Sequence, residues 1–542
     1  MNDQPKIVWQ REILPERGIL SWPRRFFGWL FSWRGLRRIL ILLIWTATII
    51  ALFYGEENWR GRHAWNKYRR QLEARGEQVD YQAFVPKPIP DEQNFAATPF
   101  VQSWFVLTND LWKDNYAQAS AMILDRKIDP SHRRFIDLVA WESAFDALHS
   151  GKPDVRPELS EQREPELRMK AAPAVLAGLK TNEAALAELR SASQRPYSRY
   201  AVFYDLENPW AILLPHLARM KAACLRLQLR ACAELAAGQS DKAFDDVNLM
   251  LYLTDSVKEE PFLISYLVRA SCLQIAAQPL WEGLAEHRWS EAQLQQLQDR
   301  FRQLDFLADL QRPLAAERAA GVLTAQLLAI GKYSLNCLGG ADESDPASPN
   351  DFEDFLGKII PRGWYDREKL NYCALHRMEL EGTFDPARKR VSPDQIESNR
   401  IELERALSGG RYKRFIHHRV VAALLLPALR NIAHRSAEAQ TAANQAAIAC
   451  ALERHRLANG QFPEKLDALV PQFISQLPND VLTGEPYKYR LTGGGQFVLY
   501  SVGWNEKDDG GTPGKSIFDD KQGDWVWQYP GEKASSSKSQ AP

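Results

Sequence analysis

The sequence predicts a mainly α-helical fold: a membrane-anchored helical domain, then a small α+β module with a long helix packed on a β-hairpin or small antiparallel sheet. Residues 131–330 are dense in Ala, Leu, Gln, Glu and Arg, which are strong helix formers. After Gly460 the chain changes to short aromatic and branched runs separated by glycines, as in antiparallel strands. An uncharged apolar run over residues 39–55 adds the membrane anchor.

Composition limits the class of protein. The 542 residues are 45% hydrophobic and 11% aromatic, which is ample core material for more than one folding unit. Lys plus Arg and Asp plus Glu both number 68, and this balance argues against a nucleic-acid partner. The six cysteines form no CxxC pair, so neither a zinc ribbon nor a disulfide-dense scaffold is indicated.

The apolar run 39–55 is about 25 Å long as a helix, at the short end of a transmembrane span. The preceding residues 1–38 carry eight basic and three acidic side chains. By the positive-inside rule this tail is cytoplasmic, and the bulk of the chain lies in the periplasm of a bacterial inner membrane. A cleaved signal peptide is the alternative, but the basic tail is long and no small-x-small site follows the run, so an uncleaved anchor is favoured. Aromatic residues suited to the two interfaces are Trp29, Trp33, Tyr54 and Trp59.

Residues 56–100 are expected to form a juxtamembrane helix and a Pro-rich extended linker. The helix is placed over 60–81, with Trp65, Tyr68 and Leu72 on one face and Gly76 as its stop. Residues 101–410 are expected to form the exported helical domain, as an irregular helical domain rather than a tetratricopeptide-type array. Its predicted helices include 222–237, 243–257 and 262–284, and its acidic loop covers 338–362.

Residues 411–530 are expected to form the α+β module, and residues 531–542 a disordered tail. The module should begin with a long helix from Arg411 to Asn459, kinked at Pro427 and ended by Gly460 in the left-handed conformation. Residues 487–491 and 497–502 should then pair as a hairpin.

One stretch of the module resembles a known family. Residues 451–463 (ALERHRLANGQFP), 480–489 (DVLTGEPYKY), 499–505 (LYSVGWN) and 508–511 (DDGG), with Asp524-Trp525, follow the motif order of the type II secretion major pseudopilins. The resemblance covers about residues 440–528 and implies that family's fold for this module. No prepilin-peptidase site precedes the apolar run, so assembly into a filament is not implied.

The resemblance also implies a calcium site in the acidic loop after Val502. The implied ligands are the backbone carbonyls of two strand residues and side chains of the loop: Leu499, Ser501, Asn505, Asp508, Asp509 and Asp524, with Asp519 and Asp520 as further candidates. Several carboxylates on one glycine-rich loop suit calcium, although their spacing is not that of an EF-hand. The alternative is a solvated acidic loop.

No catalytic motif stands out. The chain has no HExxH, GxSxG or Walker A sequence, and the histidines His417, His418, His434 and His455 are read as surface or interfacial residues. The leading hypothesis is a non-enzymatic scaffold or binding domain, with protein partners of a secretion or pilus-like apparatus implied by the resemblance. The alternative is an exported enzyme, such as a cell-wall glycan hydrolase, with two carboxylates of raised pKa in a deep pocket of the helical domain.

Overall fold

The computed structural model describes residues 32–106, 114–123, 132–151, 165–334, 357–429, 431–493, 495–515 and 522–529. Within these ranges the chain is mainly helical, with one two-stranded and one three-stranded antiparallel sheet, so the predicted fold class is confirmed. Several predicted features lie outside the described residues: most of the basic tail and of the acidic loop 338–362, Asp519, Asp520, and the C-terminal tail 531–542.

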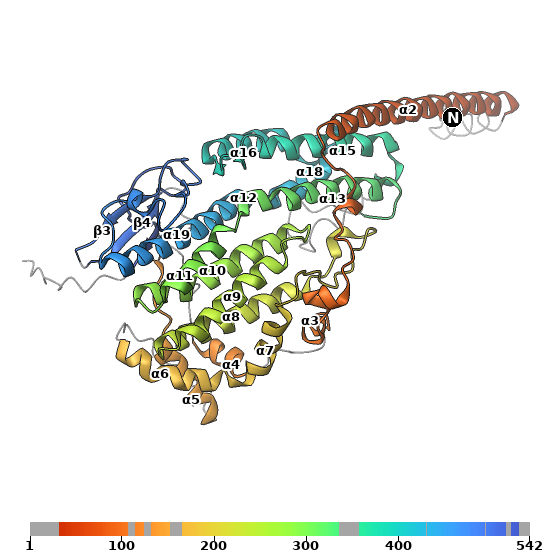
Figure 1. The fold of residues 1–542 in the computed structure, drawn as a ribbon. Coiled ribbons are helices and arrows are strands. Elements are labelled where there is room, and N and C mark those ends of the chain that lie inside the picture. The colour runs from red at the N-terminus through yellow and green to blue at the C-terminus, as the bar shows by residue number, and fades with distance from the viewer. Residues whose placement is uncertain are drawn as a thin grey trace, which may run out of the picture.

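Helix α2 (Trp33–Ala74) is a single continuous helix of 42 residues. It merges the predicted membrane span with the predicted juxtamembrane helix, and it ends at residue 74 rather than 81. Gly76, at φ 77°, and the bond from Glu77 N–H to Leu72 O (3.0 Å) close it as a Schellman motif. Figure 1 shows its N-terminal half projecting beyond the rest of the molecule.

The proline-containing segment after α2 is not an extended spacer. It folds into the short helices η1 (Tyr81–Phe84), η2 (Asp91–Gln93), η3 (Phe95–Ala97) and α3 (Pro99–Ser103). Phe95 and Trp104 are fully buried in the main core, and Asn94 Nδ2 donates to Arg199 O at 2.9 Å. The apolar side chains between the prolines therefore hold this segment on the domain surface.

The helical domain is built from antiparallel helices, and α8, α9 and α10 form its centre (Figure 1). These three helices match the three predicted between residues 222 and 284. The elements of this part are α4 (Asn115–Met122), α5 (Leu138–His149), α6 (Pro165–Gly178), η5 (Lys180–Asn182), α7 (Glu183–Ala192), η6 (Pro209–Ala211), α8 (Pro215–Ala236), α9 (Ser240–Ser256), α10 (Leu263–Ala285), α11 (Glu291–Arg302), α12 (Phe306–Asp309) and α13 (Gln311–Ala329).

The predicted long helix from Arg411 to Asn459 is broken into separate helices, which corrects the expectation of a single kink at Pro427. The chain runs through α15 (Arg362–Leu380), β1 (Phe384–Asp385), β2 (Arg390–Val391), α16 (Pro393–Leu407), α17 (Gly410–Ile416), α18 (Val420–Leu425), η8 (Leu426–Leu429) and α19 (Ile432–Asn459). His418 has φ 53°, and Asn371 Nδ2 donates to the carbonyls of His417 and His418, both at 2.8 Å. These tertiary bonds stabilise a turn where the local sequence alone permits helix.

The C-terminal module places a small sheet against α19. After η9 (Leu466–Leu469), strands β3 (Lys488–Leu491), β4 (Phe497–Ser501) and β5 (Trp525–Gln528) pair in the order β3-β4-β5, with Tyr489 opposite Leu499 and Leu499 opposite Trp527. Gly460 has φ 77°, which confirms the predicted left-handed end of α19.

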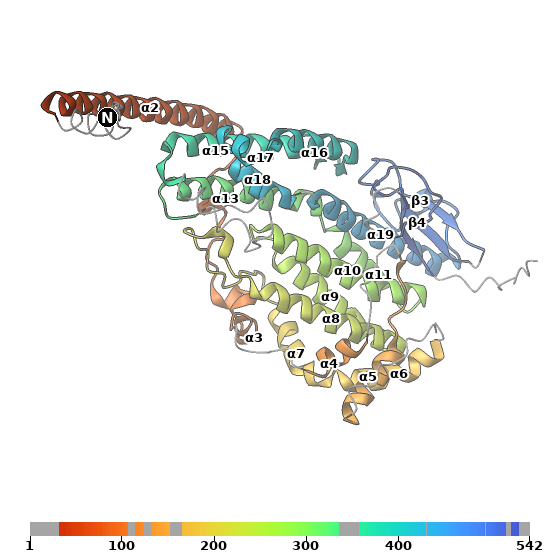
Figure 2. The same cartoon turned by 180° about the vertical axis from the view of Figure 1, so that it is seen from behind.

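The module and the helical domain share one core. Phe497, Leu499 and Trp527 belong to the same hydrophobic cluster as the central helices α8–α10. Trp281 on α10 donates its Nε1–H to Gln528 O at 3.0 Å. Figure 2 shows the module at the end of the domain opposite α2, so the long apolar helix and the three-stranded sheet lie at opposite ends of the molecule.

Candidate functional site

Helices α2 and α15 come into backbone contact just after the apolar run of α2. A Cβ on Gly61 would lie 2.0 Å from Gly363 O, and a Cβ on Gly363 would lie 2.1 Å from Glu57 O. Asn58 Oδ1 accepts the Gly363 N–H at 2.8 Å. Two glycines thus allow the two backbones to touch, as small residues do at tight crossings of membrane helices.

Glu57 stabilises this junction with a buried carboxylate. It is 8% exposed, accepts the Trp364 Nε1–H at 3.1 Å, and pairs with Arg60 at 2.8 Å. Three residues before Glu57 on α2, the Tyr54 hydroxyl donates to Ile359 O. The domain is therefore fastened to α2 from the end of the apolar run onward.

A small apolar hollow lies beside this junction, between α13, α15, α17 and α18. It is lined by Leu328, Gly357, Ile360, Trp364, Tyr365, Glu368, Phe415, His418, Val420 and Val421. Glu368 is its one carboxylate, and this carboxylate accepts the N–H groups of Val420 (3.0 Å) and Val421 (3.1 Å) at the start of α18. Burial raises the pKa of Glu368 to about 7.

His418 forms another wall of the hollow and is predominantly neutral at pH 7. Its ring lies edge-on to Trp364 at 4.8 Å. Burial, followed by the charge of Arg367, lowers the pKa of His418 to about 4. One carboxylate held by backbone amides and one neutral imidazole do not form the paired carboxylates that a glycan hydrolase requires.

The residues of the predicted calcium site are partly brought together. Asp508, Asp509 and Asp524 converge on the loop that follows β4, and Asn505 Nδ2 donates to Asp509 at 3.4 Å. Leu499 lies on the central strand β4, paired on both sides, and the Ser501 hydroxyl accepts the Gly503 N–H at 3.3 Å. The three carboxylates and the amide therefore share one loop, whereas Leu499 belongs to the sheet.

The carboxylates of this loop already accept backbone N–H groups. Asp524 accepts from Asp509 (3.2 Å) and Gly511 (2.6 Å), while Asp509 accepts from Gly523 at 2.8 Å. Burial, then backbone bonding and the charges of Asp509 and Asp508, act on Asp524, and the net effect is a raised pKa. Carboxylate and amide oxygens suit calcium. Among the described residues, however, no three His, Cys, Asp or Glu side chains are arranged so that they could hold one metal ion.

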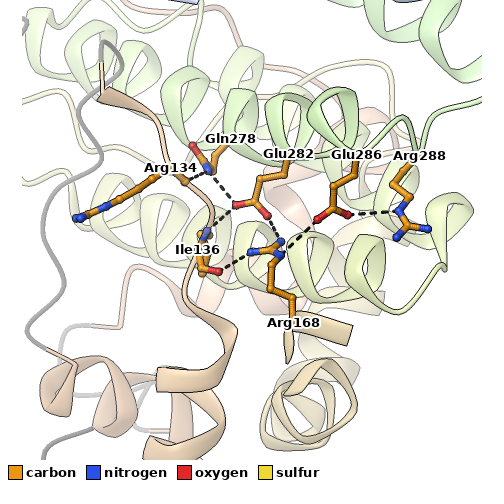
Figure 3. A network of polar contacts seen from close by, with 7 residues as sticks. All are labelled: Arg134, Ile136, Arg168, Gln278, Glu282, Glu286 and Arg288. Carbon is orange, nitrogen blue, oxygen red and sulfur yellow. Dashed lines mark hydrogen bonds and ion pairs between the residues drawn. The ribbon is translucent and has the colours of Figure 1, made fainter. Parts of the chain in front are cut away.

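A buried charge network connects α6 and α10 (Figure 3). Arg168 and Glu282 are 3% and 1% exposed and form an ion pair at 2.5 Å. Glu282 also accepts the Ile136 N–H at 2.8 Å, and Arg168 donates to Ile136 O at 2.7 Å. Arg168 and Glu282 compensate each other's charge and both bond to Ile136, so this network positions the segment before α5.

A polar stripe in the sequence of α10 is a signal for this network. Gln274, Gln278, Glu282 and Glu286 follow one another at four-residue spacing along α10, which places them on one helix face. A polar stripe on an otherwise apolar helix indicates buried partners.

A second buried cluster joins residues that no sequence pattern connects. His216 Nε2 lies 2.7 Å from Glu260, and Ser265 Oγ donates to the other oxygen of Glu260 at 2.5 Å. The His216 ring stacks on Tyr200 at 4.4 Å between ring centres. The serine contacts the carboxylate and not the imidazole, so the cluster lacks the nucleophile–base contact of a hydrolase triad.

Another pair of carboxylates with raised pKa lies between α8 and α9. Burial, followed by the charge of Asp246, raises the pKa of Glu234 to about 8. Asp246 is fully buried and paired with Arg230 at 2.6 Å and with Arg190. Arg230 and Arg190 both pair with the Asp246 carboxylate, so Glu234 and Asp246 belong to a buried ion cluster.

Comparison of the chain with protein-family models, characterised proteins and solved structures found no match. At the junction of α2 with α15, the backbone contact is accompanied by bonds from Tyr54, Glu57 and Asn58 to the segment 359–364.

Proposed function

We propose that the protein is a single-pass inner-membrane protein of a Gram-negative-type bacterium, with a periplasmic helical domain that acts as a scaffold or binding surface. In the described part of the chain, α2 is the one helix long and apolar enough to cross a membrane. Its apolar window is wholly unburied, with Leu42 at 66% and Leu52 at 68% exposure. An exposed apolar surface of this size needs a lipid environment or a partner.

The observation that carries the scaffold function is the rigid attachment of the domain to α2. The helix continues past the apolar run without a break, and the Gly61–Gly363 crossing fastens the domain to it. A domain on a flexible linker would sample many orientations. A domain fixed on its anchor presents one face to the membrane and the opposite end, with the sheet, to the periplasm.

The pseudopilin-like module is the proposed contact with a secretion or pilus-like apparatus. The order of a long helix, a left-handed glycine and an antiparallel sheet agrees with the resemblance, and the sheet lies at the end farthest from α2 (Figure 1). Calcium binding to Asp508, Asp509 and Asp524 belongs to the same proposal and is supported by the crowding of these carboxylates on one loop. The enzyme alternative has less support, because Glu368 is the one carboxylate lining the hollow, and the buried pair Glu234 and Asp246 is paired with arginines.

Reporter fusions at residues 30 and 540 test the topology. We expect a reporter that is active only in the periplasm to be silent at 30 and active at 540, and the reverse pattern would refute the proposed orientation. Cross-linking in intact membranes, followed by capture of the full chain, tests the scaffold function. We expect discrete protein adducts to form, and these should be lost when residues of β3 are replaced. A chain that remains without adducts at every position of the sheet would argue against a partner there.

A further inference from the structure

The segment before α15 lies level with the end of the apolar run. The Tyr54 hydroxyl donates to Ile359 O, and Gly363 contacts Gly61 on the next turns of α2. The two helices then run parallel, because the Lys369 ammonium lies over the Trp65 ring at 5.1 Å. At 1.5 Å rise per residue, the first turn of α15 lies within about 10 Å of the end of the apolar run.

Basic and aromatic side chains are exposed at this level. Lys358, four residues before α15, and Arg362, its first residue, are exposed, and Ile359 between them is 48% exposed. Trp59 on α2 is 68% exposed. Two acidic residues of α2 lie nearby: Glu57 is buried and bonded to Trp364, whereas Glu56 is exposed and has the Arg60 guanidinium 3.9 Å away.

Helix α17 packs beside the junction of α2 and α15. Trp364, which bonds Glu57, also packs against Phe415 of α17 at 5.6 Å between ring centres. On the outer side of α17, Tyr412 is 78% exposed and Lys413 is also exposed. Lysine and arginine with interleaved aromatic residues are typical of surfaces that meet phospholipid headgroups.

We propose that this membrane-proximal face, made of Trp59, Lys358, Ile359, Arg362, Tyr412 and Lys413, rests on anionic phospholipids of the bilayer that α2 crosses. The inference depends on the proposed membrane anchoring, and it adds the lipid class and the contacting residues. The bond between Tyr54 and Ile359 leaves too little space for a folded protein between the first turn of α15 and the headgroups. The phosphates lie within reach of long basic side chains and within the Debye length of about 8 Å at physiological salt.

A photo-crosslinking amino acid tests the position of the face. The full chain is reconstituted in nanodiscs with the crosslinker at Ile359 or at Tyr412, and with Leu491 on β3 as the control. The exposed fraction of Leu491, 42%, is similar to that of Ile359, but β3 lies at the end of the domain opposite α2 (Figure 1). We expect phospholipid adducts at 359 and 412 and none at 491.

The charge of the lipid is tested by composition and by substitution. We expect the adduct yield at 412 to be higher with phosphatidylglycerol-containing nanodiscs than with phosphatidylcholine alone. Lys358→Gln with Arg362→Gln should reduce this ratio, by about fivefold for each basic residue that contacts the headgroups. Arg388→Gln, whose side chain is 83% exposed in the turn between β1 and β2, is the matched control and should leave the ratio unchanged.

The outcomes separate the inference from the proposed function. Adducts without dependence on lipid charge would overturn the anionic-lipid assignment. If the crosslinker at 359 and 412 forms protein adducts or no adducts, and the chain still resists carbonate extraction, the lipid inference is overturned. The proposed anchoring is unaffected by that result. Release of the chain by carbonate would instead refute the anchoring itself.

Discussion

Replacement of Gly61 by Ala should separate α2 from α15, although alanine is the better helix former. In a helix interior, Gly→Ala alone stabilises by about 0.5–1 kcal/mol. At Gly61 the new Cβ would lie 2.0 Å from Gly363 O and 2.6 Å from its Cα. These are backbone atoms, which cannot rotate away, so the helices must move apart by more than about 1 Å to reach van der Waals contact.

The cost follows from the bonds at the crossing. Overpacking of this kind costs about 1–3 kcal/mol. Separation also weakens the bonds from Gly363 N–H to Asn58 (2.8 Å) and from Trp364 to Glu57 (3.1 Å), at about 1 kcal/mol each. Gly61→Ala should therefore lower the free energy of unfolding by about 2–4 kcal/mol.

Gly55→Ala is the matched control, since Gly55 lies on the same helix and a Cβ there meets nothing within 4 Å. Thermal unfolding of the full chain in nanodiscs compares the two variants. Hydrogen exchange of residues 357–370 then locates the change, and we expect faster exchange only in Gly61→Ala. Equal melting and equal exchange in both variants would refute a close backbone contact at this crossing.

The remaining predictions concern the module and the hollow. Gly460→Val should destabilise the protein by about 1–2 kcal/mol, because φ 77° disfavours β-branched residues, whereas Gly493→Ala should be nearly neutral; similar melting of both would refute the left-handed cap. The melting temperature should be higher in calcium than in chelator, and Asp508→Asn with Asp509→Asn should abolish this difference. Equal melting temperatures of the unsubstituted chain in calcium and in chelator would show that the loop is solvated and binds no calcium. Burial raises the folded-state pKa of Glu368 to about 7 from an ordinary value of 4.5, so the folded protein binds more protons between these values and this group's stability contribution falls as pH rises through them. The free energy of unfolding of Glu368→Gln, relative to that of the unsubstituted chain, should therefore rise by about 3 kcal/mol between pH 4.5 and pH 8. A difference between the two chains that does not change with pH would contradict the raised pKa.

Local sequence pattern was sufficient to predict the structure wherever a short segment determines its own conformation. The faces of α2 and of α8–α10 follow from helical spacing of apolar residues, and Trp65 and Leu72 are buried as predicted. The pairing of β3 with β4 follows from the glycine-rich turn between two aromatic and branched runs. The approach of Asp508 and Asp509 to Asp524 depends on the pairing of β4 with β5, which local pattern did not predict. The break before α18 could not be read in this way, because the Asn371 and Glu368 side chains that stabilise it come from a distant helix.

Sequence pattern alone predicts the apolar helix, the helical domain, the left-handed end of α19 and strands β3 and β4, because apolar periodicity and glycine geometry are properties of short segments. Only the tertiary structure decided that α2 touches α15 through Gly61 and Gly363, that His216 lies against Glu260, and that Arg168 is buried beside Glu282. Each of these contacts joins residues far apart in the chain. Their energies depend on close approach and on exclusion of water, which exist only once the helices have packed.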